Sequence, residues 1–185
     1  MTTWAHLVWY VDRAAGYTAL VLLTASILLG LLLSLKVASP RWPRFLTNDL
    51  HQHITLMALV FIAIHGVAIL IDPFMRFGWG DVLVPFGSAY HPLAMALGIV
   101  AGYLALAIWL SSRVRRQIGF RMWRRLHYAT FLVYVFAGVH TLLIGNDRST
   151  GWGRGVVVAS VVLVVALTAI RISTSAPTRP AEVAR

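Results

Sequence analysis

Five long runs of the sequence carry almost no charge, and they limit the fold more than any other feature. We predict membrane spans over residues 14–35, 51–71, 92–110, 126–144 and about 151–170. About 20 apolar residues in a helix cross the hydrocarbon core of a bilayer. The chain is 59% hydrophobic and only 12% charged, too little charge for the surface of a soluble domain of 185 residues. The sequence therefore predicts an all-α, polytopic membrane helix bundle of about five transmembrane helices in the lipid bilayer.

The segments outside the spans predict the remaining organisation. Residues 1–13 are expected to form an N-terminal interfacial segment, anchored at headgroup level by Trp4, Trp9 and Tyr10. Residues 14–170 form the membrane domain, and residues 171–185 a disordered cytoplasmic tail. Thr47 or Asn48 is a candidate N-cap of the second helix, and Pro92 suits the first turn of the third.

The basic residues predict the orientation of the chain. Residues 36–50, 111–125 and 171–185 hold 3, 6 and 3 of the 16 Lys and Arg residues. The N-terminal segment and residues 72–91 and 145–154 hold 1, 1 and 2. Because cytoplasmic loops collect Lys and Arg, we expect the N-terminus outside and the C-terminus in the cytoplasm, in the plasma membrane of a bacterium. The net charge of +10 has this explanation too, and we expect no nucleic-acid partner.

Four of the seven histidines form two matched pairs inside the spans. His51 and His65 lie in the second span, and His127 and His140 lie in the fourth. At about 100° and 1.5 Å per residue, His51 and His65 share one helix face and are separated by about 21 Å. The two spans run in the same direction, so His51 should face His127 near the cytoplasm. His65 should face His140 near the outer side.

Opposed imidazoles across a helix bundle are the ligand set of a bis-histidine haem. The sequence has no cysteine, which excludes disulfides, iron–sulfur clusters and thiolate metal sites. The pairs therefore suggest two stacked b-type haems, with the four histidines as axial ligands of the iron and His53 as a reserve ligand. One spacing fits poorly, because thirteen residues leave His140 about 140° away from the His127 face. We expect a local helix distortion, for which Gly138 is a candidate.

Two other interpretations remain open for the histidines. They could hydrogen-bond across helices in a structural membrane protein, or they could line the path of a transporter. Because all six acidic residues are expected in loops or tails, a cation or proton path would have no carboxylate within the membrane, which weighs against transport. His6 and His91 are expected at the membrane interface.

The pattern His51-x13-His65 and His127-x12-His140, with "FRMWRRLH" leading into the third histidine, resembles the ferric-reductase-like transmembrane domain family. That family includes the membrane parts of NADPH oxidases and ferric-chelate reductases, and the haem subunit of the bacterial periplasmic methionine sulfoxide reductase system. The resemblance covers about residues 14–170. It implies haem b on the four histidines, electrons passed from a cytoplasmic donor to an outer acceptor, and tolerance of the thirteen-residue spacing.

The chain also departs from that family. The oxidases and chelate reductases carry a flavin and nicotinamide domain after the last helix, whereas only fifteen residues follow Ile170 here, and no Gly-rich dinucleotide fingerprint is present. Many relatives also have six spans. We therefore expect a separate cytoplasmic reductase or quinol as donor, with any flavin or quinone supplied by or shared with a partner. The acceptor would be an extracytoplasmic protein or small molecule.

These inferences predict a membrane cytochrome b, the electron-transfer subunit of an oxidoreductase. The alternative of the same chemistry is a haem-bearing anchor subunit that couples the quinone pool to a peripheral redox enzyme. Arg121, Arg124 and Arg125 precede His127 and are candidate partners for the propionates of the inner haem. The same three residues also fit the ordinary positive charge of a cytoplasmic loop.

Overall fold

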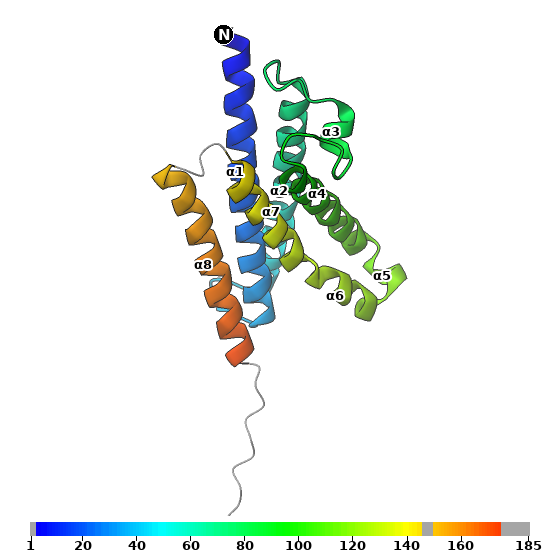
Figure 1. The fold of residues 1–185 in the computed structure, drawn as a ribbon. Helices are drawn as coiled ribbons and strands as arrows, with labels where there is room; N and C mark the ends of the chain where they lie inside the picture. The colour runs from blue at the N-terminus through cyan, green and yellow to red at the C-terminus, as the bar shows by residue number, and fades with distance from the viewer. Residues whose placement is uncertain (1–2, 146–149, 175–185) are drawn as a thin grey trace, which may run out of the picture.

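The computed structural model describes residues 3–145 and 150–174, which fold into helices joined by short connections (Figure 1). In chain order these helices are α1 (Thr3–Ser34), α2 (Arg44–Ile71), α3 (Trp79–Leu83), α4 (Pro92–Arg113), α5 (Arg115–Ile118), α6 (Phe120–Tyr128), α7 (Thr130–Ile144) and α8 (Gly151–Ser173). Five segments are long and apolar enough to cross a membrane: α1, α2, α4, α6 together with α7, and α8. The predicted all-α membrane bundle of about five spans is confirmed.

The helix ends differ from the sequence prediction in two places. Helix α1 begins at Thr3, so residues 3–13 continue the first span as helix, and their interfacial position stays a prediction. Helix α2 begins at Arg44 with Pro43 as its N-cap, so the predicted cap at Thr47 or Asn48 is wrong. The Thr47 hydroxyl lies inside the helix and accepts a hydrogen bond from Trp42 Nε1 at 2.9 Å.

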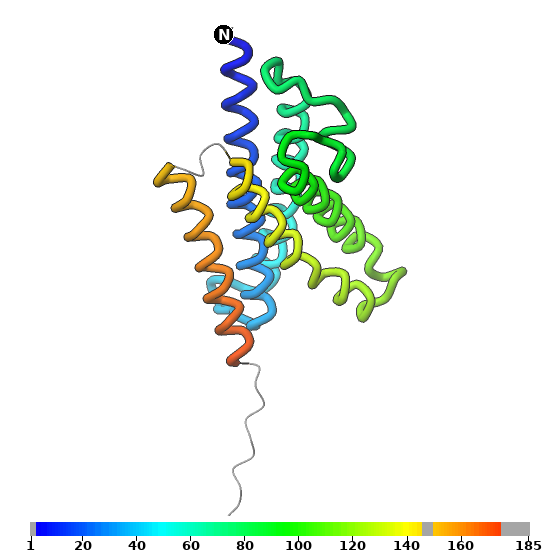
Figure 2. Tube along the Cα trace, viewed as in Figure 1, coloured from blue at the N-terminus to red at the C-terminus, as the bar shows by residue number. Residues whose placement is uncertain are grey.

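The spans form two closely packed helix pairs, as the tube in Figure 2 shows. Helix α1 packs along α2, α4 packs along α7, and α8 packs against α1. One buried cluster joins α1, α7 and α8 through Leu20, Tyr134, Val157 and Val164, and a second joins α4 and α7. In the described part of the chain, the backbone of α2 does not pack against that of α6 or α7. The two pairs therefore leave room between α2 and α6–α7 for side chains to meet.

The fourth span is interrupted at Ala129, between α6 and α7, where the chain changes direction (Figure 1). Ala129 has a ψ of −8°, far from the helical value of about −42°. The Thr130 hydroxyl donates to the His127 carbonyl at 2.8 Å, which gives this backbone group a partner at the break. The expected distortion between His127 and His140 is present. Its predicted position at Gly138 is wrong, because Gly138 lies within α7.

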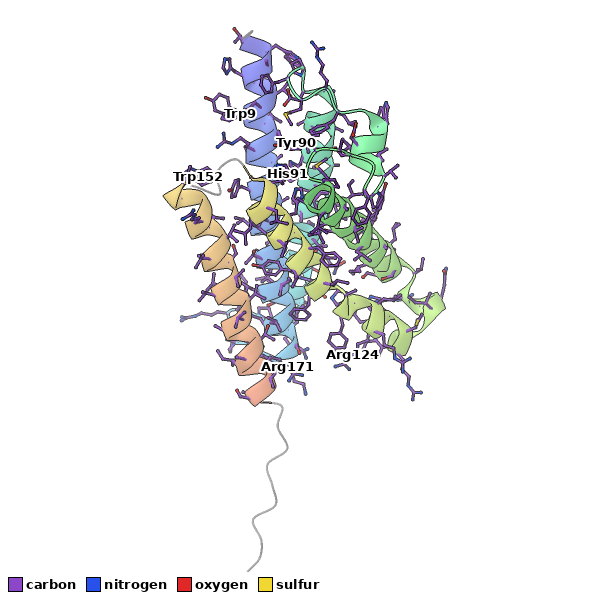
Figure 3. The ribbon with its side chains drawn as sticks, viewed as in Figure 1. Trp9, Tyr90, His91, Arg124, Trp152 and Arg171 are labelled. Atoms are coloured by element: carbon purple, nitrogen blue, oxygen red, sulfur yellow. The ribbon has the colours of Figure 1, made fainter. Side chains whose placement is uncertain are left out.

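The basic segments gather at one end of the bundle. The α1–α2 connection, α5 with α6, and the end of α8 lie toward the same end in Figure 1. Figure 3 shows Arg124 and Arg171 at this end, and Trp9, Tyr90 and Trp152 at the other. This separation agrees with the charge pattern, and the side that faces the cytoplasm stays a prediction. Of the expected tail, residues 171–173 continue α8, and residues 175–185 lie outside the described part.

Candidate functional site

The four histidines of the spans meet in the two pairs that the sequence predicts. The ring centroids of His51 and His127 are 6.2 Å apart, with an angle of 71° between the planes. Those of His65 and His140 are also 6.2 Å apart, at 82°. Helix α2 supplies one ring to each pair, so the pairs stand about 21 Å apart along its axis. The break at Ala129 lets both α6 and α7 direct a histidine toward α2.

Three of the four rings are oriented by the same kind of hydrogen bond. In each of them Nδ1 donates to a main-chain carbonyl of the neighbouring helix. These bonds join His51 to Ser26 at 2.9 Å, His65 to Asp12 at 3.1 Å, and His140 to Ala94 at 2.7 Å. A proton held on Nδ1 leaves the Nε2 lone pair free, which is the tautomer that a metal-bound histidine needs.

A glycine lies against each of these rings, one helical turn beyond the carbonyl, and at Gly16 and Gly98 a Cβ would crowd the ring. A Cβ atom at these positions would lie 3.2 Å from the His65 ring at Gly16, 3.6 Å from the His51 ring at Gly30, and 2.6 Å from His140 Nδ1 at Gly98. Each of the three rings is therefore held between a carbonyl and a glycine of the adjacent helix. Helices α1 and α4 were not assigned any role by sequence reasoning. The only available signal was that Asp12/Gly16 and Ser26/Gly30 repeat at the same interval as His51 and His65.

His127 is held differently from the other three. Its buried Nδ1 has no hydrogen-bond partner in the described part of the chain. Instead, the ring stacks on Trp123, with centroids 5.0 Å apart and planes inclined by 31°. Trp123 is itself fixed, because its Nε1 donates to Ser112 Oγ at 3.1 Å. Trp123 thus supplies the orientation that a carbonyl supplies elsewhere.

For a haem bound by the His51–His127 pair, we expect Trp123→Leu to weaken binding at this pair selectively. His127 would lose the ring that restrains it, and loss of a group that orients a metal ligand typically reduces affinity about tenfold to a hundredfold. Release of cofactor to an excess of apomyoglobin, followed by absorbance, measures this change. Trp109→Leu is the matched control, because Trp109 lies on α4 and stacks with Arg113 rather than with a histidine. Equal release from both variants would contradict the role of Trp123.

The outer pair includes a carboxylate that sequence reasoning placed elsewhere. Asp12 lies in α1, and its Oδ1 is 2.8 Å from His65 Nδ1. The prediction that all acidic residues lie in loops or tails is therefore wrong for Asp12, and also for Asp49 in α2. Asp81 lies in the five-residue helix α3, within the connection between the spans α2 and α4. Asp147 and Glu182 lie outside the described residues. The error arose because α1 extends to Thr3 beyond the uncharged run.

The remaining candidates lie outside the two pairs. Arg121, Arg124 and Arg125 are exposed on α6, and Arg124 Cζ lies 5.9 Å from the Phe120 ring centre. His53 is exposed, with Nδ1 2.7 Å from the carbonyl of Asp49 on its own helix. His6 is exposed on α1, and His91 precedes α4 in a left-handed conformation beside Tyr90. None of these three histidines joins a pair.

The geometry of each pair fits an iron between two imidazoles. Metal–nitrogen bonds of about 2 Å, together with half a ring on either side, require ring centroids roughly 6 Å apart. Both pairs have this separation, and three rings present the correct tautomer. The described residues contain no group of three or more His, Cys, Asp or Glu that could hold a bare metal ion. The donor set is thus two facing imidazoles at each level, as a bis-histidine haem requires.

Comparison with known proteins identifies the family of the chain. The family model described as "Ferric reductase like transmembrane component" matches residues 15–138, about two thirds of the chain. The match includes His51, His65 and His127, and it ends just before His140. No curated protein and no solved structure shows significant similarity to the sequence. The chain belongs to the family of ferric-reductase-like transmembrane components.

Proposed function

We propose that this chain is a membrane cytochrome b that carries electrons across the bilayer between two bis-histidine haems. The observation that carries the proposal is a pair of neighbouring imidazoles at each of two levels of the bundle, with centroids 6.2 Å apart in both. Haem b, when bound, supplies a one-electron iron couple. The contribution of the chain is to fix the two sites on one helix, about 21 Å apart along its axis.

Each helix has a definite part in this function. Helix α2 supplies His51 and His65, and α6 and α7 supply His127 and His140. Helices α1 and α4 orient three of the four rings with carbonyl groups and bring a glycine against each of them. Trp123 of α6 stacks on the fourth ring, His127. The bonds to carbonyl groups also satisfy the Nδ1 donors of the three rings, which have no water to bind within the hydrocarbon. The sites are thus preorganised mainly by helices that contribute no ligand themselves.

Among the three arginines of α6, Arg124 is the best placed to pair with a propionate of the inner haem. At about 100° per residue, Arg124 lies about 60° from His127 around the helix, whereas Arg125 lies about 160° away. A charge-assisted bond to a carboxylate suits an arginine at this position. All three arginines lie at the end of the bundle that we assign to the cytoplasm.

The donor and acceptor follow from the proposed direction. Electrons would enter near the His51–His127 pair from a separate cytoplasmic reductase or from quinol. They would leave near the His65–His140 pair to an extracytoplasmic protein or small acceptor. The related possibility of an anchor subunit that couples the quinone pool to a peripheral enzyme differs only in its donor, so inhibition by quinone analogues distinguishes the two.

Transfer across the membrane can be tested in sealed vesicles. The purified chain, loaded with haem, is reconstituted into vesicles that contain ferricyanide. Dithionite is then added outside the vesicles, together with valinomycin and K⁺, which balance the charge of the transferred electrons. We expect the trapped ferricyanide to be reduced faster than in protein-free vesicles, and His65→Ala to abolish the difference. Reduction of both haems with no gain in ferricyanide reduction would contradict the function.

A further inference from the structure

The two histidine pairs have unequal electrostatic surroundings. In the outer pair, His65 Nδ1 lies 2.8 Å from the Asp12 carboxylate and 3.1 Å from the Asp12 carbonyl. In the inner pair, His51 Nδ1 contacts only neutral groups, the Ser26 carbonyl at 2.9 Å and the Ser26 hydroxyl at 3.3 Å. His127 Nδ1 has no partner among the described residues. A carboxylate therefore reaches one ligand of the outer pair, and neutral groups serve the inner pair.

The contact between Asp12 and His65 is built into the packing of α1 on α2. Only 24% of the Asp12 side chain and 27% of the His65 side chain is exposed. Gly16, one turn beyond Asp12, packs against the same ring and lets it lie close to α1. The neighbouring cation, Arg13, is directed onto Trp9, with Cζ 3.9 Å from the ring centre. The carboxylate and the imidazole are thus held together by the fold.

A carboxylate in this position affects the electronic properties of a metal ligand. Its negative charge, 2.8 Å from Nδ1, stabilises positive charge on the imidazole and strengthens the donation of the ring through Nε2. Its negative charge, in a region of low dielectric, also favours the more positive ferric state over the ferrous state. Both effects lower the reduction potential of an iron bound to His65. The neutral groups around the inner pair lower the potential of an iron bound there less.

We propose that Asp12 is a positioning residue that makes the outer haem the lower-potential centre of the two. The inference rests on the proposed function, since it presumes that both pairs bind haem. The lower potential matters at the extracytoplasmic side of the membrane, where the electron leaves the chain. A lower potential at the outer site gives the acceptor a stronger one-electron reductant than the inner site would provide.

The test is a redox titration of the purified holoprotein, followed at the absorption bands of the two haems. The component that disappears in His65→Ala identifies the outer haem. In the unmodified chain we expect this component to have the lower potential. In Asp12→Asn we expect its reduction equilibrium to shift at least about tenfold toward the ferrous form, which is about 59 mV for one electron. The inner haem should titrate as before.

Asp72→Asn is the matched control. It removes one negative charge at the same end of the bundle, but the Asp72 carboxylate accepts from Phe74 N and does not contact a histidine. An equal shift of the outer haem's potential in both variants would show that the shift depends only on net charge, which would overturn the inference. An unchanged outer potential in Asp12→Asn, with two haems bound, would overturn it while leaving the proposed function intact.

Two further outcomes are also decisive. If Asp12→Asn releases the outer haem, Asp12→Glu, which keeps a carboxylate, must retain that haem at a low potential. Loss of the haem from both variants would assign Asp12 a purely structural role and overturn the inference. A chain that binds no haem at all would overturn the proposed function together with the inference.

Discussion

Replacement of either histidine of a pair by alanine is expected to remove one haem and leave the other. His65→Ala and His140→Ala should abolish the same spectral component, and His51→Ala and His127→Ala the other. The reason is geometric, because each iron depends on both rings of its own pair and the two pairs are separated by about 21 Å of helix. The haem content should fall from two per chain to one in each variant, as measured by pyridine haemochrome and reduced-minus-oxidised spectra.

His53→Ala and His6→Ala serve as controls for this series. Both residues are exposed histidines that join neither pair, so both variants should keep two haems and unchanged spectra. Loss of one identical component in all four paired variants would contradict the arrangement in two levels. Retention of both haems in any of the four would remove that histidine from the ligand set.

Replacement of Gly98 by alanine is expected to disrupt the outer site almost as completely as replacement of His65 or His140. A Cβ at this position would lie 2.6 Å from His140 Nδ1 and 2.7 Å from Cε1, closer than real Cβ contacts come. The ring would have to move by more than the roughly 0.5 Å that a functional ligand geometry tolerates. It would also break its bond to the Ala94 carbonyl. We expect loss of the outer haem, measured as for the histidine variants, with the inner haem retained.

Gly102→Ala is the matched control, one turn further along α4. A Cβ there would make only an ordinary contact of 3.6 Å with Ile62 Cγ2, so both haems should remain. Gly30→Ala, at 3.6 Å from the His51 ring, should likewise be tolerated. If Gly98→Ala kept a normal outer haem, or if Gly102→Ala lost it equally, close packing against His140 would not explain the requirement for glycine.

The spans and the pairing of the histidines could be predicted because both follow from helix periodicity. An apolar run of about 20 residues has few alternatives to a membrane helix. On a regular helix such as α2, a fourteen-residue interval fixes a common face for His51 and His65. The pairing required that the second and fourth spans run in parallel, which the alternating topology dictates, and that the helix be distorted between His127 and His140. The binding of haem to these pairs stays a prediction.

The elements that the sequence did not reveal depend on contacts between distant residues. The break at Ala129 lies between α6 and α7. Alanine favours a regular helix, so the residue type does not predict a break there. The carbonyl groups of Ser26 and Ala94 act through the main chain, so their side chains carry no signal. Asp12 was assigned to a segment outside the first span because it precedes the uncharged run, although the helix extends past it to Thr3.

The number of haems per purified chain is the most direct test of the central claim. Quantitative pyridine haemochrome analysis, combined with spectra of the oxidised and dithionite-reduced protein, measures the number and the ligation together. We predict two b-type haems per chain, both low-spin with bis-histidine bands. A chain that contains no haem after expression with ample haem supply would contradict the account, and the histidine pairs would then have to be explained as packing or transport residues.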